Sequence, residues 1–198
     1  MSRLRRPLAS VLVVGLAGLI SGSATVAAFS STAQDGGNAF EVGTTVLQDD
    51  DAGAAMLTLT DARPGDTAEG CILVTYTGTL DASVVLYGNV TDALAPYLAL
   101  TVTRGSDAAP SFPSCAGFVP DPGDPYGLGP GVLYRGPLSD YPGSYASGIV
   151  DPDPLTALPE VWTTGEAHAY RFEVTMGPDP AAQGLTASAV FAWEARNL

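Results

Sequence analysis

Short segments in which apolar and polar residues alternate recur along this chain, and turn-forming residues separate them. Within 55–90, alternation predicts strands at 57–60, 71–76 and 80–90, with a turn at Pro64-Gly65. Proline presets φ and glycine tolerates positive φ, as a tight turn requires. No catalytic motif interrupts this stretch. We therefore interpret it as the centre of a sheet to which the rest of the chain is added.

Alternation is clearest near the C-terminus, over 170–176 and 185–195, and it recurs at 98–103. The count of roughly seven to nine strands separated by turns is typical of a sandwich. The 23 Gly and 16 Pro favour turns over long helices. We predict an all-β protein, a jelly-roll-like antiparallel β-sandwich, with a single domain over 29–198. The predicted core residues are Leu57, Ile72, Val74, Phe172, Phe191 and Trp193.

The segment 105–165 differs in composition and predicts a long irregular insertion. Eleven of the 16 prolines lie within 109–159, and such a density excludes long regular elements. Arg104-Gly105 is expected to end the preceding strand, and a short strand is expected at 132–135. The tyrosines of this segment either form an outer contact surface or pin the loop to the domain. Four aspartates beside proline or glycine are interpreted as turn residues: Asp121, Asp124, Asp151 and Asp153.

Residues 1–28 have the pattern of an export signal. Three arginines precede the apolar run 8–20, and small residues end at Ala28, which predicts cleavage before Phe29. A secreted or cell-surface protein beginning at Phe29 is expected. Measurement of its intact mass would show the loss of residues 1–28. The alternative is an uncleaved membrane anchor, which would be the chain's only contact with a membrane. The apolar run is short and broken by glycine for a spanning helix.

Charge excludes several classes of partner. The formal net charge is −13, and loss of the three signal arginines makes it −16. An acidic surface argues against nucleic acid and anionic membranes, although it could attract divalent cations weakly.

The two cysteines, Cys71 and Cys115, fit an oxidising compartment. A disulfide between them would stabilise the folded state by up to about 4 kcal/mol in the chain-entropy model, because it closes a long loop in the unfolded chain. Cys71 has the parity opposite to Ile72 and Val74, so the bridge would pin an outer loop to the sheet. Two unpaired thiols are the alternative.

The residues that enzymes need are scarce, so we predict no enzyme, no cofactor and no metal. The single histidine, His168, cannot build a zinc site of two or three histidines, and it is interpreted as packed or at the rim. No nucleophile elbow or phosphate-binding loop occurs. Consecutive acids at 49–51 lack the alternate spacing of a calcium loop and are interpreted as a solvated turn.

Several motifs in order resemble the TasA and camelysin family of exported proteins. They are GSATVAAFSSTA around the signal end, GNAFEVGTTVL, and LTLTDARPGDTAEGCILVTYTGTLDA, followed by the closing pair HAYRFEVTM and GLTASAVFAWEA. Residues 15–103 and 166–195 carry the likeness. The segment 105–165, the cysteine pair and the lack of lysine depart from it.

The resemblance implies a fibre subunit of a biofilm matrix or cell surface. Its principal partner would be itself, with other matrix or cell-wall components possible, and the freed N-terminal strand would pair into the next subunit. Phe40 and Val42 are the expected same-face anchors of that assembly strand. Camelysin-like proteins have also been associated with secreted metallopeptidase activity, but this chain lacks the metal-binding residues that such an enzyme needs. The alternative function is a monomeric cell-surface module that binds through the long Pro/Gly/Tyr loop.

Overall fold

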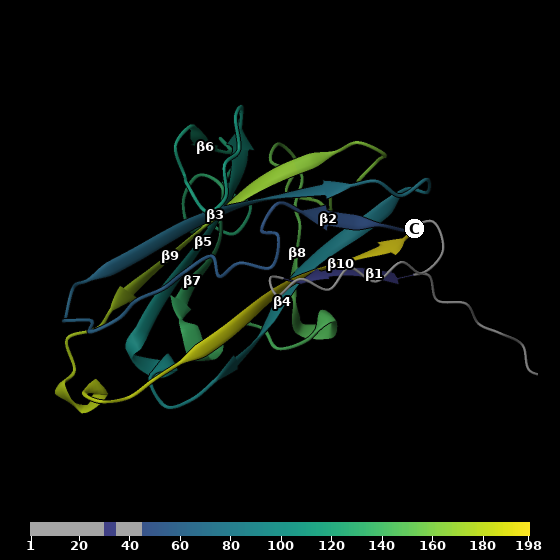
Figure 1. Ribbon diagram of the computed structural model, residues 1–198. Helices are drawn as coiled ribbons and strands as arrows, with labels where there is room; N and C mark the ends of the chain where they lie inside the picture. Colours follow the sequence, from purple (N-terminus) through teal and green to yellow (C-terminus); the bar gives the residue numbers. More distant parts are fainter. Residues whose placement is uncertain (1–29, 35–44) are drawn as a thin grey trace, which may run out of the picture.

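The computed structural model describes residues 30–34 and 45–198, which form two packed antiparallel sheets (Figure 1). The first sheet has the order β1-β10-β4-β8. Its strands are β1 (Ser30–Gln34), β10 (Ser188–Asn197), β4 (Ala82–Thr91) and β8 (Ile149–Val150). The all-β, antiparallel sandwich predicted from the sequence is confirmed.

The second sheet has the order β2-β3-β9-β5-β6, and β7 also pairs with β5. Its strands are β2 (Leu47–Asp49), β3 (Thr67–Tyr76), β9 (Ala167–Met176), β5 (Leu98–Asp107), β6 (Phe118–Pro120) and β7 (Val132–Pro137). Of the five long strands, β4 and β10 lie in the first sheet and β3, β5 and β9 in the second, so the chain passes between the sheets from β3 to β4, from β4 to β5 and from β9 to β10. Four short 3-10 helices lie in the connections: η1 (Ala95–Tyr97), η2 (Leu138–Asp140), η3 (Tyr145–Ser147) and η4 (Pro180–Ala182).

The core lies between the facing sides of the two sheets, where the alternating apolar residues meet. The Phe172 ring of β9 lies 4.4 Å from that of Phe191 and 5.9 Å from that of Trp193, both of β10. Burying each such side chain stabilises the fold by roughly 1.5–3 kcal/mol. Five of the six predicted core residues are buried, and Leu57 is half-buried.

The segment 105–165 is largely irregular, and it is also an integral part of the sandwich. Its prolines and glycines do limit it to short elements, and the predicted strand at 132–135 is confirmed as β7. The segment nevertheless contributes β6, β7 and β8 and places side chains in the core. They are Leu133, Leu138, Tyr141, Ile149 and Trp162. Composition predicted the loops correctly but missed these anchors, because isolated apolar residues between prolines have no periodicity.

Two tyrosines of this segment, Tyr126 and Tyr141, hold it against the rest of the domain. Tyr141 is buried and makes edge-to-face contacts with Phe191 and Tyr134, so it pins the loop to the first sheet. Tyr126 is 43% exposed but donates a hydrogen bond to the carbonyl oxygen of Val150. Both therefore hold the segment in place.

The acids at 49–51 do not form a solvated turn. Asp49 ends β2, Asp50 accepts a hydrogen bond from the Leu73 amide, and Asp51 is buried with 2% of its surface exposed. Burial, followed by the charge of Asp51, raises the pKa of Asp49 to about 6. These carboxylates bind the end of β2 to β3 and to the following turn.

The predicted disulfide is present. Cys71 of β3 bonds to Cys115, in the loop before β6, with a Cα–Cα distance of 5.0 Å. No helix among the described residues is long and apolar enough to cross a membrane.

Candidate functional site: an apolar groove and a buried charge cluster

An apolar groove of about 1080 Å³ opens between the two sheets. One wall is the segment 53–64, which precedes β3, and the other is 179–189, which leads into β10. Core side chains form its floor: Leu98, Leu138, Val174, Met176 and Phe191. Within residues 30–34 and 45–198, no element closes the sandwich here. A groove of this shape and chemistry can accept an extended apolar segment.

The first wall contains residues predicted to be a strand. The alternation of Leu57 and Leu59 with threonines is typical of a strand, yet 57–60 pairs with no strand of the described chain. The prediction of a strand there was wrong, because alternation reports a half-buried face and not a ladder partner. Both leucines are half-buried and line the groove, while Met56 packs against Gly70 of β3.

The second wall ends in a partly open strand edge. β4 pairs with β10 from Ser188 to Asn197, whereas β1 pairs only with the half from Ala192 to Arg196. On the β1 side, 188–191 has no neighbouring strand among the described residues. Unpaired amides and carbonyls along such an edge are a template for an additional strand.

The N-terminal strand falls partly within the described chain. β1 lies at the edge of its own sheet, with Ser30 opposite Arg196 and Gln34 opposite Ala192 of β10. The predicted anchors Phe40 and Val42 lie outside the described residues, as do the predicted cleavage residues Ala28 and Phe29.

A cluster of charged groups lies under the long loop, at the end of β5. Arg104 is 2% exposed, and its guanidinium donates hydrogen bonds to the Pro152 carbonyl and the Glu160 carboxylate. Its Nε lies 3.4 Å from Asp121 and 3.5 Å from Asp151. Arg104 does not end its strand as expected, because β5 continues to Asp107. One buried cation therefore holds three segments of the loop on the sheet.

Asp151 is the most deeply buried carboxylate of this cluster. It is 0% exposed and accepts hydrogen bonds from Trp162 Nε1 at 2.9 Å and from the Tyr170 hydroxyl at 3.0 Å. Burial raises its pKa to about 6, although the Arg104 charge and these hydrogen bonds oppose the rise. The interpretation of Asp151 as a simple turn residue was wrong. It was based on the adjacent proline, and local sequence does not indicate a contact with a buried arginine 47 residues away in the chain.

Three ligand-type groups in the cluster, from Asp151, Glu160 and His168, lie within 4.8 Å of one another. However, the guanidinium of Arg104 lies 2.9 Å from His168 Nε2 and directly contacts Glu160. A cation shared by these groups would have to displace it. His168 is half-buried, with its ring 4.6 Å from that of Trp162, in agreement with a packed or rim histidine. The cluster therefore serves to anchor the loop.

Stability should decline between about pH 6.5 and 8 because of Glu160. Burial, together with the charges of Asp151 and Glu166, raises the pKa of Glu160 to about 8. A carboxyl group whose pKa is higher in the folded state than in the unfolded state binds its proton more tightly in the folded state. Its contribution to stability is complete below the unfolded-state pKa and is lost as the pH rises through the folded-state pKa. Burial and the Arg104 charge lower the pKa of His168 to about 4, so the stability linked to it is lost only on acidification below about 6.5.

Thermal melts at pH 6.5 and 8 test this expectation. The melting temperature should fall at the higher pH in the natural chain and fall less in Glu160→Gln, which cannot titrate. Glu173→Gln on β9 is a matched control outside the cluster. An equal fall in all three proteins would contradict the assignment to Glu160.

No protein-family model matches the chain, and neither does any curated protein.

Proposed function

We propose that the protein is an exported structural subunit that assembles into extracellular fibres by exchange of its N-terminal strand. The observation that carries the proposal is the edge of β10. Half of this edge is covered by the edge strand β1. The other half lies beside the apolar groove, and no strand of the described chain pairs with it on that side. The resemblance to the TasA and camelysin family supports the same function.

Strand exchange requires no new kind of contact. The ladder that β1 makes with its own β10 is the ladder that a neighbour's β1 would make, so both pairings have similar local energies. A head-to-tail exchange repeats from subunit to subunit and does not close, which generates a filament. Main-chain hydrogen bonds would supply affinity, and pockets for alternate side chains would supply specificity.

The register of β1 gives the groove a role in this assembly. A donated strand that continued this register past Gln34 would run along the open half of β10, from Phe191 to Ser188. In unbroken register Phe40 and Val42 would lie opposite Thr186 and Gly184, on the face of β10 that points away from Phe191, so a one-residue bulge at Gly36-Gly37 is needed to turn them toward the groove. We propose that these two side chains fill the groove of the next subunit, where they would bury apolar surface.

A mixing experiment tests the exchange directly. Ser30→Cys and Arg196→Cys are made as separate secreted proteins, because these positions are partners in the ladder and the native cysteines are already bonded. The proteins are mixed under assembly conditions, oxidised, and analysed by non-reducing electrophoresis and electron microscopy. Filaments with a cross-linked heterodimer are expected.

Each single variant oxidised alone is the control for cross-links formed by random collision. The double variant, kept monomeric, should cross-link within one chain. Filaments without the heterodimer would exclude exchange of β1. Discrete particles alone, at every concentration, would exclude the fibre function.

One observation favours the alternative, a monomeric surface module. Leu155 and Leu158 are 84% and 64% exposed on a turn fixed by Asp153, whose carboxylate accepts hydrogen bonds from the amides of Leu155 and Thr156. A fixed turn with exposed leucines can contact a protein partner. Discrete particles in the mixing experiment would favour this function, and Leu155→Ser with Leu158→Ser should then reduce binding to the cell surface.

A further inference from the structure

The outer edge of β3 is covered in an unusual way. β2 pairs only with Val74–Tyr76, so most of this ten-residue strand extends beyond its neighbour. The Thr77 amide donates a hydrogen bond to the Val46 carbonyl on the β2 side. Backbone amides alternate in direction along a strand, so those of Leu73 and Cys71 point to the same side as that of Thr77. These amides therefore point away from β9, along an edge that another strand could extend.

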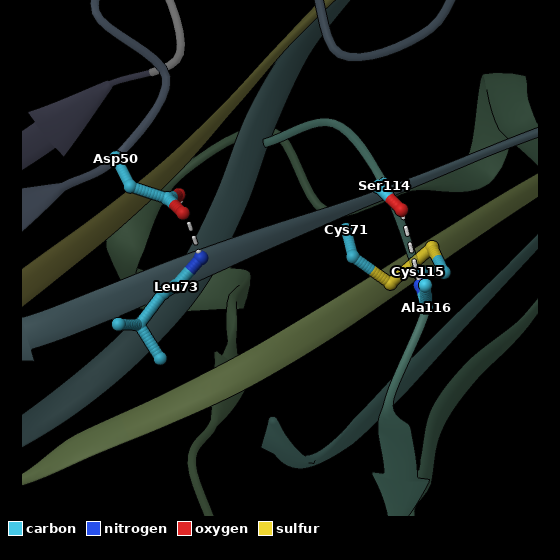
Figure 2. Close-up of a disulfide and its surroundings, with 6 residues drawn as sticks. All are labelled: Asp50, Cys71, Leu73, Ser114, Cys115 and Ala116. Carbon is cyan, nitrogen blue, oxygen red and sulfur yellow. Dashed lines mark hydrogen bonds between the residues drawn. A yellow bond between two sulfur atoms is a disulfide. The ribbon is translucent and has the colours of Figure 1, made fainter. Parts of the chain in front are cut away.

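Two non-strand groups occupy this edge. The Asp50 carboxylate accepts a hydrogen bond from the Leu73 amide at 2.9 Å (Figure 2). The Pro113 carbonyl accepts one from the Cys71 amide at 3.0 Å. Pro113 belongs to the loop that the disulfide attaches to β3 two residues later, at Cys115. That loop contains a tight turn, in which the Ser114 amide donates a hydrogen bond to the Ser111 carbonyl.

We infer that the Cys71–Cys115 disulfide and Asp50 form an edge guard, which closes the edge of β3 to strand addition by a second copy of this chain. The bridge holds the Pro113 carbonyl against the amide that an added strand would need. β3 is rich in β-branched and apolar residues, and exposed edges of such strands associate. The inference does not rest on fibre assembly through β1. If that assembly operates, the guard keeps strand addition away from β3 while the unpaired half of the β10 edge accepts it.

The first test removes the bridge from the full mature chain. In Cys71→Ser/Cys115→Ser, the amide at position 71 should exchange with deuterium about tenfold faster or more, since it loses a tethered acceptor. The variant should also form oligomers that the bridged protein does not form, measured by sedimentation velocity. Val102→Ala, a core change with the bridge intact, controls for lower stability and should stay free of these oligomers.

A proline placed at the edge tests whether β3 is the surface involved. Glu69 is exposed and has the parity of Cys71, so its amide faces the edge and not β9. Glu69→Pro in the bridge-free background should abolish the additional oligomers while keeping the β3–β9 ladder, whereas Glu69→Ala should not. In the bridged chain, Glu69→Pro should leave any assembly through β1 unchanged.

Two outcomes would overturn the edge guard. One is a bridge-free protein that neither exchanges faster at position 71 nor associates. The other is association that persists in the Glu69→Pro background or appears equally in Val102→Ala, because association would then follow from general unfolding.

Discussion

Replacing Arg104 with alanine is expected to destabilise the folded protein by about 3–5 kcal/mol near pH 7.5, the range for removing one partner of a buried ion pair. The guanidinium is 2% exposed, and its removal leaves the fully buried Asp151 without its cation. Glu160 loses its hydrogen bond from the same group. Since domains of this size are stable by about 5–15 kcal/mol, much of the total would be lost. Urea denaturation monitored by tryptophan fluorescence measures the change.

The pH dependence distinguishes this mechanism from simple loss of packing. Without Arg104, Asp151 loses the neighbouring positive charge that lowers its pKa, so the carboxyl group takes up a proton more readily on acidification. The destabilisation should therefore shrink at pH 5. Asp151→Asn in the same background should recover part of the stability at pH 7.5. Arg135→Ala, an exposed arginine on β7, is the matched control and should change stability by about 0.5 kcal/mol or less. A loss that is independent of pH and not rescued would mean that packing, and not charge, dominates.

Deletion of residues 29–42 from the mature chain is expected to abolish fibres and leave a soluble monomer that melts cooperatively. The deletion removes β1 and the predicted anchors Phe40 and Val42. It leaves the core of β3, β9 and β10, which contains Ile72, Phe172 and Trp193. Electron microscopy gives the assembly state, and circular dichroism with thermal melting gives the state of the domain.

A smaller change tests the contribution of one anchor. Burial of a phenylalanine contributes roughly 1.5–3 kcal/mol, so Phe40→Ala should raise the critical concentration for assembly by about tenfold or more. Gln34→Ala, at the end of β1, is a control that keeps the anchors. If the deletion variant does not fold, β1 belongs to its own sandwich. If it still forms fibres, assembly uses another surface, and the exposed turn of 105–165 is the first to examine.

The sequence predicted the parts of this protein that depend on local periodicity. Alternation at 170–176 and 185–195 predicted β9 and most of β10, and their apolar faces do form the core. The disulfide was predictable because the chain has two cysteines, and therefore one possible intramolecular pair, and because the expected export favoured bonding. Two features of the groove were not. The segment 57–60 has a strand pattern without a ladder, and the open half of β10 appears only when its neighbours are known.

The sequence by itself determined the fold class, since a two-residue period with frequent Pro and Gly turns excludes long helices and requires a second sheet to cover each apolar face. Only the tertiary structure decided which edges are covered and which charges meet. Arg104, Asp151, Glu160 and His168 are dispersed along the chain, and they become one cluster because β5 lies beside β9 under the loop. The physical reason is that strand pairing and ion pairing are contacts between residues distant in sequence, whereas hydrophobic periodicity is encoded locally.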